Sequence, residues 1–586
     1  MDIYGQDTTY IWPTNSGQFL SSTFGETRSA HFHAGLDIKT WGREGYEVYA
    51  TKDGILSRLL ITNKGYGKAI YLKHEDGYYT VYAHLQRFNA DFQAIADSIR
   101  LTDFSYTFEE FLESANIKVK KGDLIGYTGS TGIGPPHLHY EIRNEKNQPI
   151  NPLRSNLSVK DTIAPTFSSI LLEPLSIDTR IFGSVYPQKI KPFKVQNDTT
   201  FYDTVYVNGS FGFSPEVFDE SNSVTNKYAV YKLKLVRNGE TLYSEILNKF
   251  DFEEAEMMFL NRVPEPNSNR RSYQRLFTPS ESAHPFLVEE KLPVQLKSGE
   301  YSIIAEDFYG NRSTAIIPVT QSSKEKSRIS RDISFDLWTN NWISINDSTN
   351  LDLRDLKSRI VWNSSENQRI LNFKESLNRT VARITPNQKH KIVSPDYSIT
   401  TFIQSNTFFD TVSVILDRSV INDSVFIQIG VSELTSRKDI FLQIQIGISR
   451  FSNEHLNLYK IDKDGEFDFE NSWFSGSTLK ASISSLGMFV ILNDTTPPKV
   501  FNPKLIQLGN GRISYSIKTD DNLSGVDHTA AYFEINGLRG IPEYDYENDT
   551  FTFYHPSFQI KKENNILFKV KDRAGNFISK SFLLKN

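Results

Sequence analysis

The stretch His137-Leu138-His139-Tyr140-Glu141-Ile142-Arg143 places two histidines at alternate positions of a predicted strand. Its apolar side chains fall on every second residue, a pattern typical of a half-buried β-strand. Because successive side chains of a strand point to opposite faces, His137 and His139 share a face and can reach one pocket. The stretch therefore predicts a β-sheet that carries paired imidazoles.

The remaining histidines cluster in the same part of the chain. Six of the eleven histidines fall between positions 31 and 139: His31, His33, His74, His84, His137 and His139. The chain has no cysteine, so any zinc site must use His, Asp or Glu. Asp37 follows His33 by four residues, which fits a helical turn or a loop that enters a strand. Gly35 favours the loop, but the spacing alone does not decide.

Five blocks of this region, in this order, resemble the lysostaphin/LytM-type zinc endopeptidases of peptidase family M23. The resemblance covers about a quarter of the chain, from Phe24 to Asn151. The matching blocks are His33-Ala-Gly-Leu-Asp37, Gly45 to Gly54, Tyr82-Ala-His84-Leu, Val119 to Gly132, and Pro136-His137-Leu-His139-Tyr-Glu141.

This resemblance implies a hydrolytic zinc site and assigns its residues. It makes His33, Asp37 and His139 the zinc ligands, and His84 and His137 the two non-ligand histidines beside the metal. Zinc polarises a scissile carbonyl and lowers the pKa of its bound water, while histidines can take a proton and stabilise the oxyanion or protonate the leaving amine. We favour His137 as the base because its strand position fixes it next to His139, although the sequence leaves the choice between His84 and His137 open.

Two features depart from the family pattern. The connection between His84 and Val119 is long, with apolar residues at helical spacing in Phe88–Ile99 and a second predicted helix at Thr107–Ser114. This insertion is either a lid or wall of the site or a packed pair of surface helices. The second departure is an additional proline before His137, which stiffens the turn without removing a ligand.

The whole chain is predicted to be mainly β, with a small antiparallel catalytic sheet followed by about three immunoglobulin-like β-sandwich modules. Its 586 residues suit about four domains, and its apolar stretches are short and alternating. Two modules open on similar text, at Asp161 and Asp494, and close on Asp-x-x-Gly-Asn turns at Asp307 and Asp572. A charged linker is expected at 324–331. The predicted domains are 1–158, 159–323, 324–493 and 494–586.

Composition limits the partners. The net charge is −5 and no long basic run occurs, which argues against nucleic acid. No apolar stretch of about 20 residues predicts a transmembrane segment. The start, Met1 to Asp7, is polar and shows no signal peptide, so the chain is either cytosolic or an exported protein whose signal has been removed. The resemblance favours the second: a periplasmic, envelope or secreted protein that acts on peptidoglycan, with a possible envelope partner for the C-terminal modules.

The C-terminal modules show no second catalytic pattern. The acid-rich segment Asp520–Asp527 could bind calcium through oxygen ligands, but we favour a solvated loop. Three function classes remain: a zinc endopeptidase, a non-catalytic regulator of wall hydrolases, and an adhesin-like structural protein with an occluded peptidase unit. The five intact site residues favour the enzyme.

Overall fold

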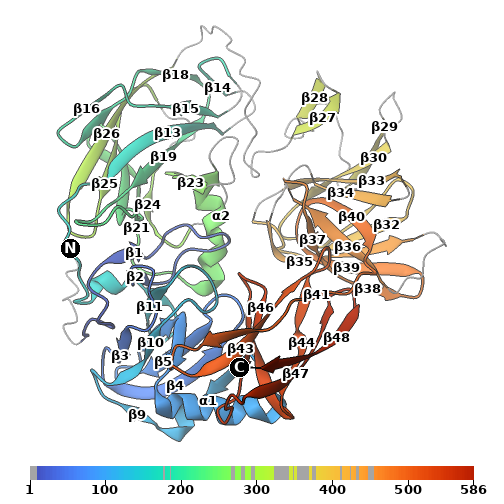
Figure 1. Cartoon of the computed structure of the whole chain (residues 1–586). Helices are drawn as coiled ribbons and strands as arrows, with labels where there is room; N and C mark the ends of the chain where they lie inside the picture. Colours follow the sequence, from blue (N-terminus) through green and yellow to red (C-terminus); the bar gives the residue numbers. More distant parts are fainter. Residues whose placement is uncertain are drawn as a thin grey trace.

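The computed structural model confirms a mainly β chain (Figure 1). It describes residues 10–175, 179–184, 187–264, 271–278, 284–291, 297–321, 342–346, 349–352, 368–372, 378–409, 412–422, 424–430, 435–446, 455–462 and 464–585. The predicted linker at 324–331 lies outside these residues, as does the first part of the chain at 1–9. No described helix has the length and apolar character needed to cross a membrane.

The N-terminal domain is built on a large antiparallel sheet in the order β1-β2-β11-β6-β5-β4-β8. These strands are β1 (Leu20–Ser22), β2 (Leu36–Lys39), β11 (His137–Arg143), β6 (Tyr79–Ala83), β5 (Lys68–Lys73), β4 (Gly54–Ile61) and β8 (Phe108–Phe111), with β9 (Lys118–Val119) on β4 and β12 (Pro149–Ile150) on β11. A smaller sheet contains β3 (Glu47–Tyr49), β10 (Leu124–Thr128) and β7 (Leu85–Phe88). One apolar core joins the two sheets, and Leu138 and Tyr140 of β11 lie fully buried in it. The apolar face of the predicted histidine strand is thus the inner face.

Of the two helices predicted in the insertion between His84 and Val119, the first is confirmed and the second is not. The first part of the insertion is the helix α1 (Ala90–Asp103), which begins after Asn89, whose side chain accepts a hydrogen bond from the Phe92 amide. The predicted second helix at Thr107–Ser114 is wrong. This segment forms strand β8, which pairs with β4, followed by a short 3₁₀ turn (Glu113–Ala115). Residues 108–111 alternate between half-buried and exposed, so the edge of β4 offers them a better arrangement than an isolated helical turn.

The second module pairs two sheets around its own core. Their strands are β13 (Thr166–Pro174), β14 (Arg180–Ile181), β15 (Gln188–Ile190), β16 (Lys194–Gln196), β17 (Thr199–Phe201), β18 (Val205–Asn208), β19 (Phe211–Phe218), β20 (Lys232–Arg237), β21 (Glu240–Ile246), β24 (Leu287–Glu290), β25 (Gly299–Glu306) and β26 (Arg312–Gln321). Between them lie a 3₁₀ turn (Phe252–Met257), α2 (Met258–Asn261) and the hairpin of β22 (Arg262–Pro264) and β23 (Arg271–Gln274).

The third and fourth modules are also built from antiparallel strands. The third contains β27 (Trp342–Asn346), β28 (Thr349–Asp352), β29 (Gln368–Asn372), β30 (Asn378–Ile384), β31 (His390–Val393), β32 (Ile399–Ile403), β33 (Val412–Ile421), β34 (Ser424–Ile429), β35 (Thr435–Gln445), β36 (Leu456–Ile461), β37 (Phe467–Phe469), β38 (Asn471–Ser475), β39 (Thr478–Ser485) and β40 (Gly487–Asn493). The fourth contains β41 (Lys499–Val500), β42 (Lys504–Gln507), β43 (Ile513–Asp520), β44 (Val526–Ile535), β45 (Leu538–Asp545), β46 (Thr550–Tyr554), β47 (Glu563–Asp572) and β48 (Phe577–Lys585). Each module has its own buried cluster, whereas the domain boundaries drawn from the sequence stay predictions.

The fourth module packs against the N-terminal domain, and the blue and red segments of the chain lie side by side in Figure 1. Arg100 of α1 is fully buried and donates to Glu543 of β45 at 2.8 Å. The Lys68 ammonium approaches the same carboxylate at 3.4 Å. The α1 helix is therefore packed between the first and fourth units, which supports the packed-helix interpretation of the insertion.

We predict that Glu543→Ala loosens this contact, because it leaves the buried Arg100 guanidinium without its carboxylate. The free energy of local opening in α1 and β45, measured by hydrogen exchange of their amides, should fall by about 3 kcal/mol. The matched control is Glu563→Ala, which removes an exposed ion pair with Lys585 in the same module and should cost less than about 1 kcal/mol. Equal effects of the two changes would contradict a buried Arg100–Glu543 clamp.

Candidate metal centre and catalytic histidines

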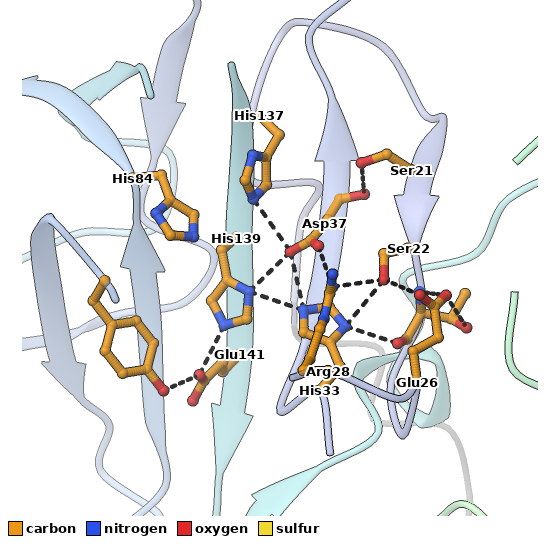
Figure 2. A network of polar contacts seen from close by, with 12 residues as sticks. Ser21, Ser22, Glu26, Arg28, His33, Asp37, His84, His137, His139 and Glu141 are labelled. Atoms are coloured by element: carbon orange, nitrogen blue, oxygen red, sulfur yellow. Dashed lines mark hydrogen bonds and ion pairs between the residues drawn. The ribbon is translucent and has the colours of Figure 1, made fainter. Parts of the chain in front are cut away.

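The register of three strands brings the predicted site residues together. In the pairing of β11 with β2, His139 lies opposite Asp37, so the two side chains share a face. In the pairing of β11 with β6, His139 lies opposite Ala83, the last residue of β6, and His84 follows at once. Figure 2 shows these side chains converging from neighbouring strands.

His33 reaches the site from the loop before β2. The loop passes close to β11, where a Cβ on Gly35 would lie 2.2 Å from the carbonyl oxygen of Tyr140. Only glycine fits at this approach. The structure thus resolves the ambiguity of the His33–Asp37 spacing in favour of a loop that enters a strand.

Three candidate ligand atoms form a tight triangle. His33 Nε2 lies 3.0 Å from Asp37 Oδ1 and 3.0 Å from His139 Nδ1, and His139 Nδ1 lies 2.9 Å from Asp37 Oδ1. Tetrahedral zinc bonds of about 2.0–2.1 Å imply ligand atoms about 3.3 Å apart, close to the observed separations. All three residues are buried. Two imidazole nitrogens and one carboxylate oxygen in this arrangement fit a zinc ion with an open fourth position.

The far sides of both imidazoles are held in place. His33 Nδ1 donates to the carbonyl oxygen of Thr23 at 2.7 Å, which leaves Nε2 free of a proton in the neutral ring. His139 Nε2 lies 2.8 Å from Glu141 Oε1, which likewise directs Nδ1 towards Asp37. Metal-binding histidines in proteins are usually oriented by such partners.

Charges around the triangle favour a cation within it. Although burial opposes the shift, hydrogen bonds with Asp37 and Glu141 raise the pKa of His139 to about 9. Burial likewise opposes the ionised form of Glu141, but the charge of Arg143 and the His139 hydrogen bond lower its pKa to about 2. The two carboxylates therefore stabilise a positive charge at His139, and a zinc ion would supply that charge in place of a proton.

The predicted pair of non-ligand histidines lies beside the triangle. The rings of His84 and His137 are 4.5 Å apart between centroids, and His137 Nε2 lies 3.5 Å from Asp37 Oδ1. His84 Nδ1 donates to the carbonyl of Thr131, and His137 Nδ1 donates to that of Pro135. In the neutral form of either ring, Nε2 is therefore the atom that can accept a proton. Burial and the neighbouring histidines lower the pKa of His84 to about 3, so its imidazole is neutral at pH 7.

The loop that contains Gly67 passes close to the loop that contains Thr131, next to these histidines. Gly67 has a φ of +60°, and a Cβ there would lie 2.2 Å from the Thr131 carbonyl oxygen. His84 itself adopts a φ of +57°, the left-handed region that is unfavourable for a residue with a Cβ. Such local strain is common at functional sites.

Several charged partners of the site have no assigned role among the sequence-based predictions. Arg28 donates to Asp37 Oδ2 at 2.5 Å, and Glu141 receives Arg143 Nε at 2.6 Å and the Tyr66 hydroxyl at 2.6 Å. Glu141 could have been found, because it lies two residues after His139 and so shares its face of the strand. Arg28 carries no such signal, since it approaches from a loop.

We predict that Glu141→Gln weakens zinc binding by about 10- to 100-fold, because the neutral amide no longer stabilises the orientation and charge of His139. Competition with a chelator of known affinity measures this change. Glu145→Gln is the control, because Glu145 is exposed in the turn after β11 and should leave the affinity unaltered. Unaltered affinity in Glu141→Gln would contradict the orienting role.

Comparisons with known proteins agree with this geometry. The profile of Peptidase family M23 matches residues 31–96 and 106–152. Murein hydrolase activator NlpD of Escherichia coli is 32% identical over 147 residues, which are 25% of this chain and 31% of that protein. DD-carboxypeptidase/endopeptidase Mpg of Neisseria meningitidis is 33% identical over 122 residues, 21% of this chain and 22% of that protein.

A solved structure of a zinc containing peptidase from Vibrio cholerae shares 22% identity, covers 25% of this chain and 39% of that one, and has a TM-score of 0.19. By the match of the family profile, residues 31–96 and 106–152 belong to a domain of peptidase family M23. The matched part spans less than a third of the length of the two curated relatives, 31% and 22%.

Proposed function

We propose that this protein is a zinc-dependent endopeptidase that hydrolyses peptide bonds in the stem peptides or cross-links of peptidoglycan. The observation that carries the proposal is the triangle of His33, Asp37 and His139 with two further histidines beside it. Every one of these side chains is oriented by a second contact. A protein that merely retained the fold would have no need of this complete arrangement.

In the proposed mechanism His33, Asp37 and His139 hold the zinc ion. A zinc ion held there would polarise the scissile carbonyl and lower the pKa of a water molecule, the nucleophile. Arg28 neutralises the second oxygen of Asp37, and Glu141 fixes the ring of His139. These contacts organise the site before substrate binds, so little reorganisation is needed during the reaction.

His137 is the proposed general base. Its Nδ1 proton is engaged by Pro135, so Nε2 carries the lone pair that accepts a proton, and this atom faces Asp37 at the edge of the triangle. His84 stands on the other side of His137 with its own Nε2 free of a proton. We propose that the proton that His137 takes from the attacking water passes to the neighbouring His84, which then stabilises the oxyanion or donates this proton to the leaving amine.

Exposed apolar side chains next to the site support binding of an extended peptide. Trp41 is 49% exposed just after β2, and Ile133 is 55% exposed in the turn before β11. The fourth module contributes to the same rim, because the Gly134 amide donates to Glu547 at 2.8 Å and the Lys64 ammonium lies 3.8 Å from the centre of the Tyr546 ring. We propose that the turn between β45 and β46 borders the substrate cleft.

The proposed substrate places the protein in the cell envelope or outside the cell. One relative is named as an activator of a murein hydrolase and the other as a carboxypeptidase/endopeptidase, which supports peptidoglycan as the partner. An envelope protein bound through the C-terminal modules remains part of this proposal.

The second candidate is a non-catalytic activator of wall hydrolases, and the specific observation behind it is the similarity to NlpD. The five intact site residues favour the peptidase. A third candidate, an adhesin-like structural protein with an occluded peptidase unit, has less support, because Trp41 and Ile133 leave exposed surface beside the histidines.

Digestion of purified peptidoglycan by the full chain, with mass spectrometry of the soluble products, tests these candidates together. The endopeptidase should release cleaved stem or cross-link peptides, and a chelator should suppress the release. The activator should release nothing alone but should accelerate an added murein hydrolase. No effect in either assay would favour the structural candidate and contradict the proposal.

A further inference from the structure

Two groups of three aspartates lie outside the zinc site, one in the second module and one in the fourth. The first consists of Asp161, Asp219 and Asp307, and the second of Asp494, Asp521 and Asp572. Within each group one oxygen of every carboxylate lies within 4.8 Å of the others. The acid-rich segment Asp520–Asp527 contributes only Asp521 to the second group, and the other two aspartates of that group come from distant parts of the chain.

The two clusters are built in the same way. Asp307 accepts hydrogen bonds from the backbone and side-chain nitrogens of Asn311 at 2.7 and 2.6 Å. Asp572 accepts the same two bonds from Asn576, both at 2.8 Å. Each Asp-x-x-Gly-Asn turn therefore fixes one carboxylate at the end of the strand before the last one of its module.

The other members also occupy corresponding places. Asp161 and Asp494 precede the first strands of their modules, and each caps the backbone two residues further on, at Ile163 and Thr496. Asp219 follows β19 and Asp521 follows β43. The same three-carboxylate arrangement thus occurs twice in one chain, at equivalent positions of two modules.

Each cluster contains buried polar atoms that lack a partner. Asp219 is only 6% exposed, and its Oδ1 is buried with no donor among the described residues. The Oδ1 atom of Asp521 is also buried and has no hydrogen-bond partner among the described residues. In the second cluster the hydroxyl of Tyr459, a fully buried side chain, also has no hydrogen-bond partner in the described structure. Burial and, after it, the charges of Asp494, Asp572 and Asp521 raise the pKa of this hydroxyl.

Nothing in the described structure neutralises these carboxylates. No described Lys or Arg forms an ion pair with any of the six aspartates. Three carboxylates this close repel one another, and burial makes each charge more costly.

We propose that each cluster binds one Ca²⁺ ion. Calcium takes six to eight oxygen ligands in a flexible geometry, so three carboxylates with carbonyl oxygens and water suit it. Zinc and other softer ions prefer nitrogen or sulfur, which neither cluster offers. This inference does not depend on the proposed peptidase activity.

Both calcium sites lie where their module meets the preceding unit. Near the first, the Tyr228 hydroxyl donates to the carbonyl of Leu20 in β1, and the Val159 amide donates to the Tyr309 hydroxyl. Near the second, the Asp494 amide donates to the carbonyl of His455, whose ring contacts the carbonyl of Ala574. A cation at each site would therefore fix the angle between adjacent units and so the position of the peptidase domain.

The proposal is tested by calorimetric titration with CaCl₂ of the full chain, which is first stripped of metal by a chelator, freed of the chelator and reloaded with one zinc ion. We expect two Ca²⁺ ions per chain, one in Asp219→Asn, one in Asp521→Asn and none in the double variant. Thermal unfolding should shift upward with calcium in the wild type and not in the double variant. The controls Glu220→Gln and Asp520→Asn replace the neighbouring acids and should keep both ions.

Other results would overturn the proposal. Absence of binding up to about 10 mM calcium, beyond the usual range of protein sites, would show that protons neutralise the clusters instead. Two bound ions in the double variant would place calcium elsewhere. If a variant fails to fold, Tb³⁺ luminescence of the wild type, sensitised by Tyr228, Tyr309 and Tyr459, decides: it must appear with Tb³⁺ and be displaced by Ca²⁺.

Discussion

Asp37→Ala is expected to remove bound zinc and hydrolytic activity together. Asp37 Oδ1 is the atom common to both histidine ligands, at 3.0 Å from His33 Nε2 and 2.9 Å from His139 Nδ1. Its loss leaves two neutral ligands and an unpaired Arg28 guanidinium that repels a cation. Activity should fall by on the order of 10⁴-fold or more, because the metal supplies the activated nucleophile.

Metal analysis after dialysis, with a hydrolysis assay on the same sample, measures both effects of Asp37→Ala. Asp91→Ala is the matched control, because Asp91 is exposed in the first turn of α1 and should leave zinc content and rate unaltered. His139→Ala should behave as Asp37→Ala does. A dialysed Asp37→Ala protein that retained one zinc ion per chain would contradict the ligand assignment.

His137→Ala is expected to keep the zinc ion and lose the reaction. His137 lies beside the triangle rather than in it, and general-base catalysis contributes about 10²- to 10⁴-fold to a rate. The turnover number should fall by that factor, while zinc content stays at one per chain. The measurement is again metal analysis paired with hydrolysis kinetics, with His31→Ala as the control on an exposed neighbouring histidine.

A comparison with His84→Ala separates the roles of the two histidines. If His137 is the base, His137→Ala should abolish the acidic limb of the pH–rate profile, where protonation inactivates a general base, and His84→Ala should preserve that limb. Full hydrolysis by His137→Ala would show that the assignment of the base is wrong.

Local patterns in the sequence predict much of the site. The alternation in His137–Arg143 correctly predicts a strand with both histidines on one face, because side-chain direction in a strand depends only on position. The loop geometry of His33 follows from Gly35, whose lack of a Cβ permits the approach to Tyr140. These features depend on a few neighbouring residues, and a sequence displays them directly.

Other features depend on contacts between distant segments. Strand β8 was predicted as a helix, because its apolar residues fit both periods and only the edge of β4 decides between them. The contact between the fourth module and α1 depends on two side chains, Arg100 and Glu543, which are 443 residues apart in the sequence. The sequence shows no pairing signal for them. The two aspartate clusters likewise join residues from three separate places in each module, of which only the repeated turns are visible in the sequence.

The most direct test of the central claim is the hydrolysis of a purified cross-linked muropeptide by chelator-treated protein that is titrated with zinc. Mass spectrometry of the products identifies the bond that is cut. The account predicts no cleavage without metal, a rate that rises with added zinc, and saturation at one zinc ion per chain. An intact muropeptide at full zinc occupancy, with the same result for peptidoglycan sacculi, would contradict the account and favour a regulatory role.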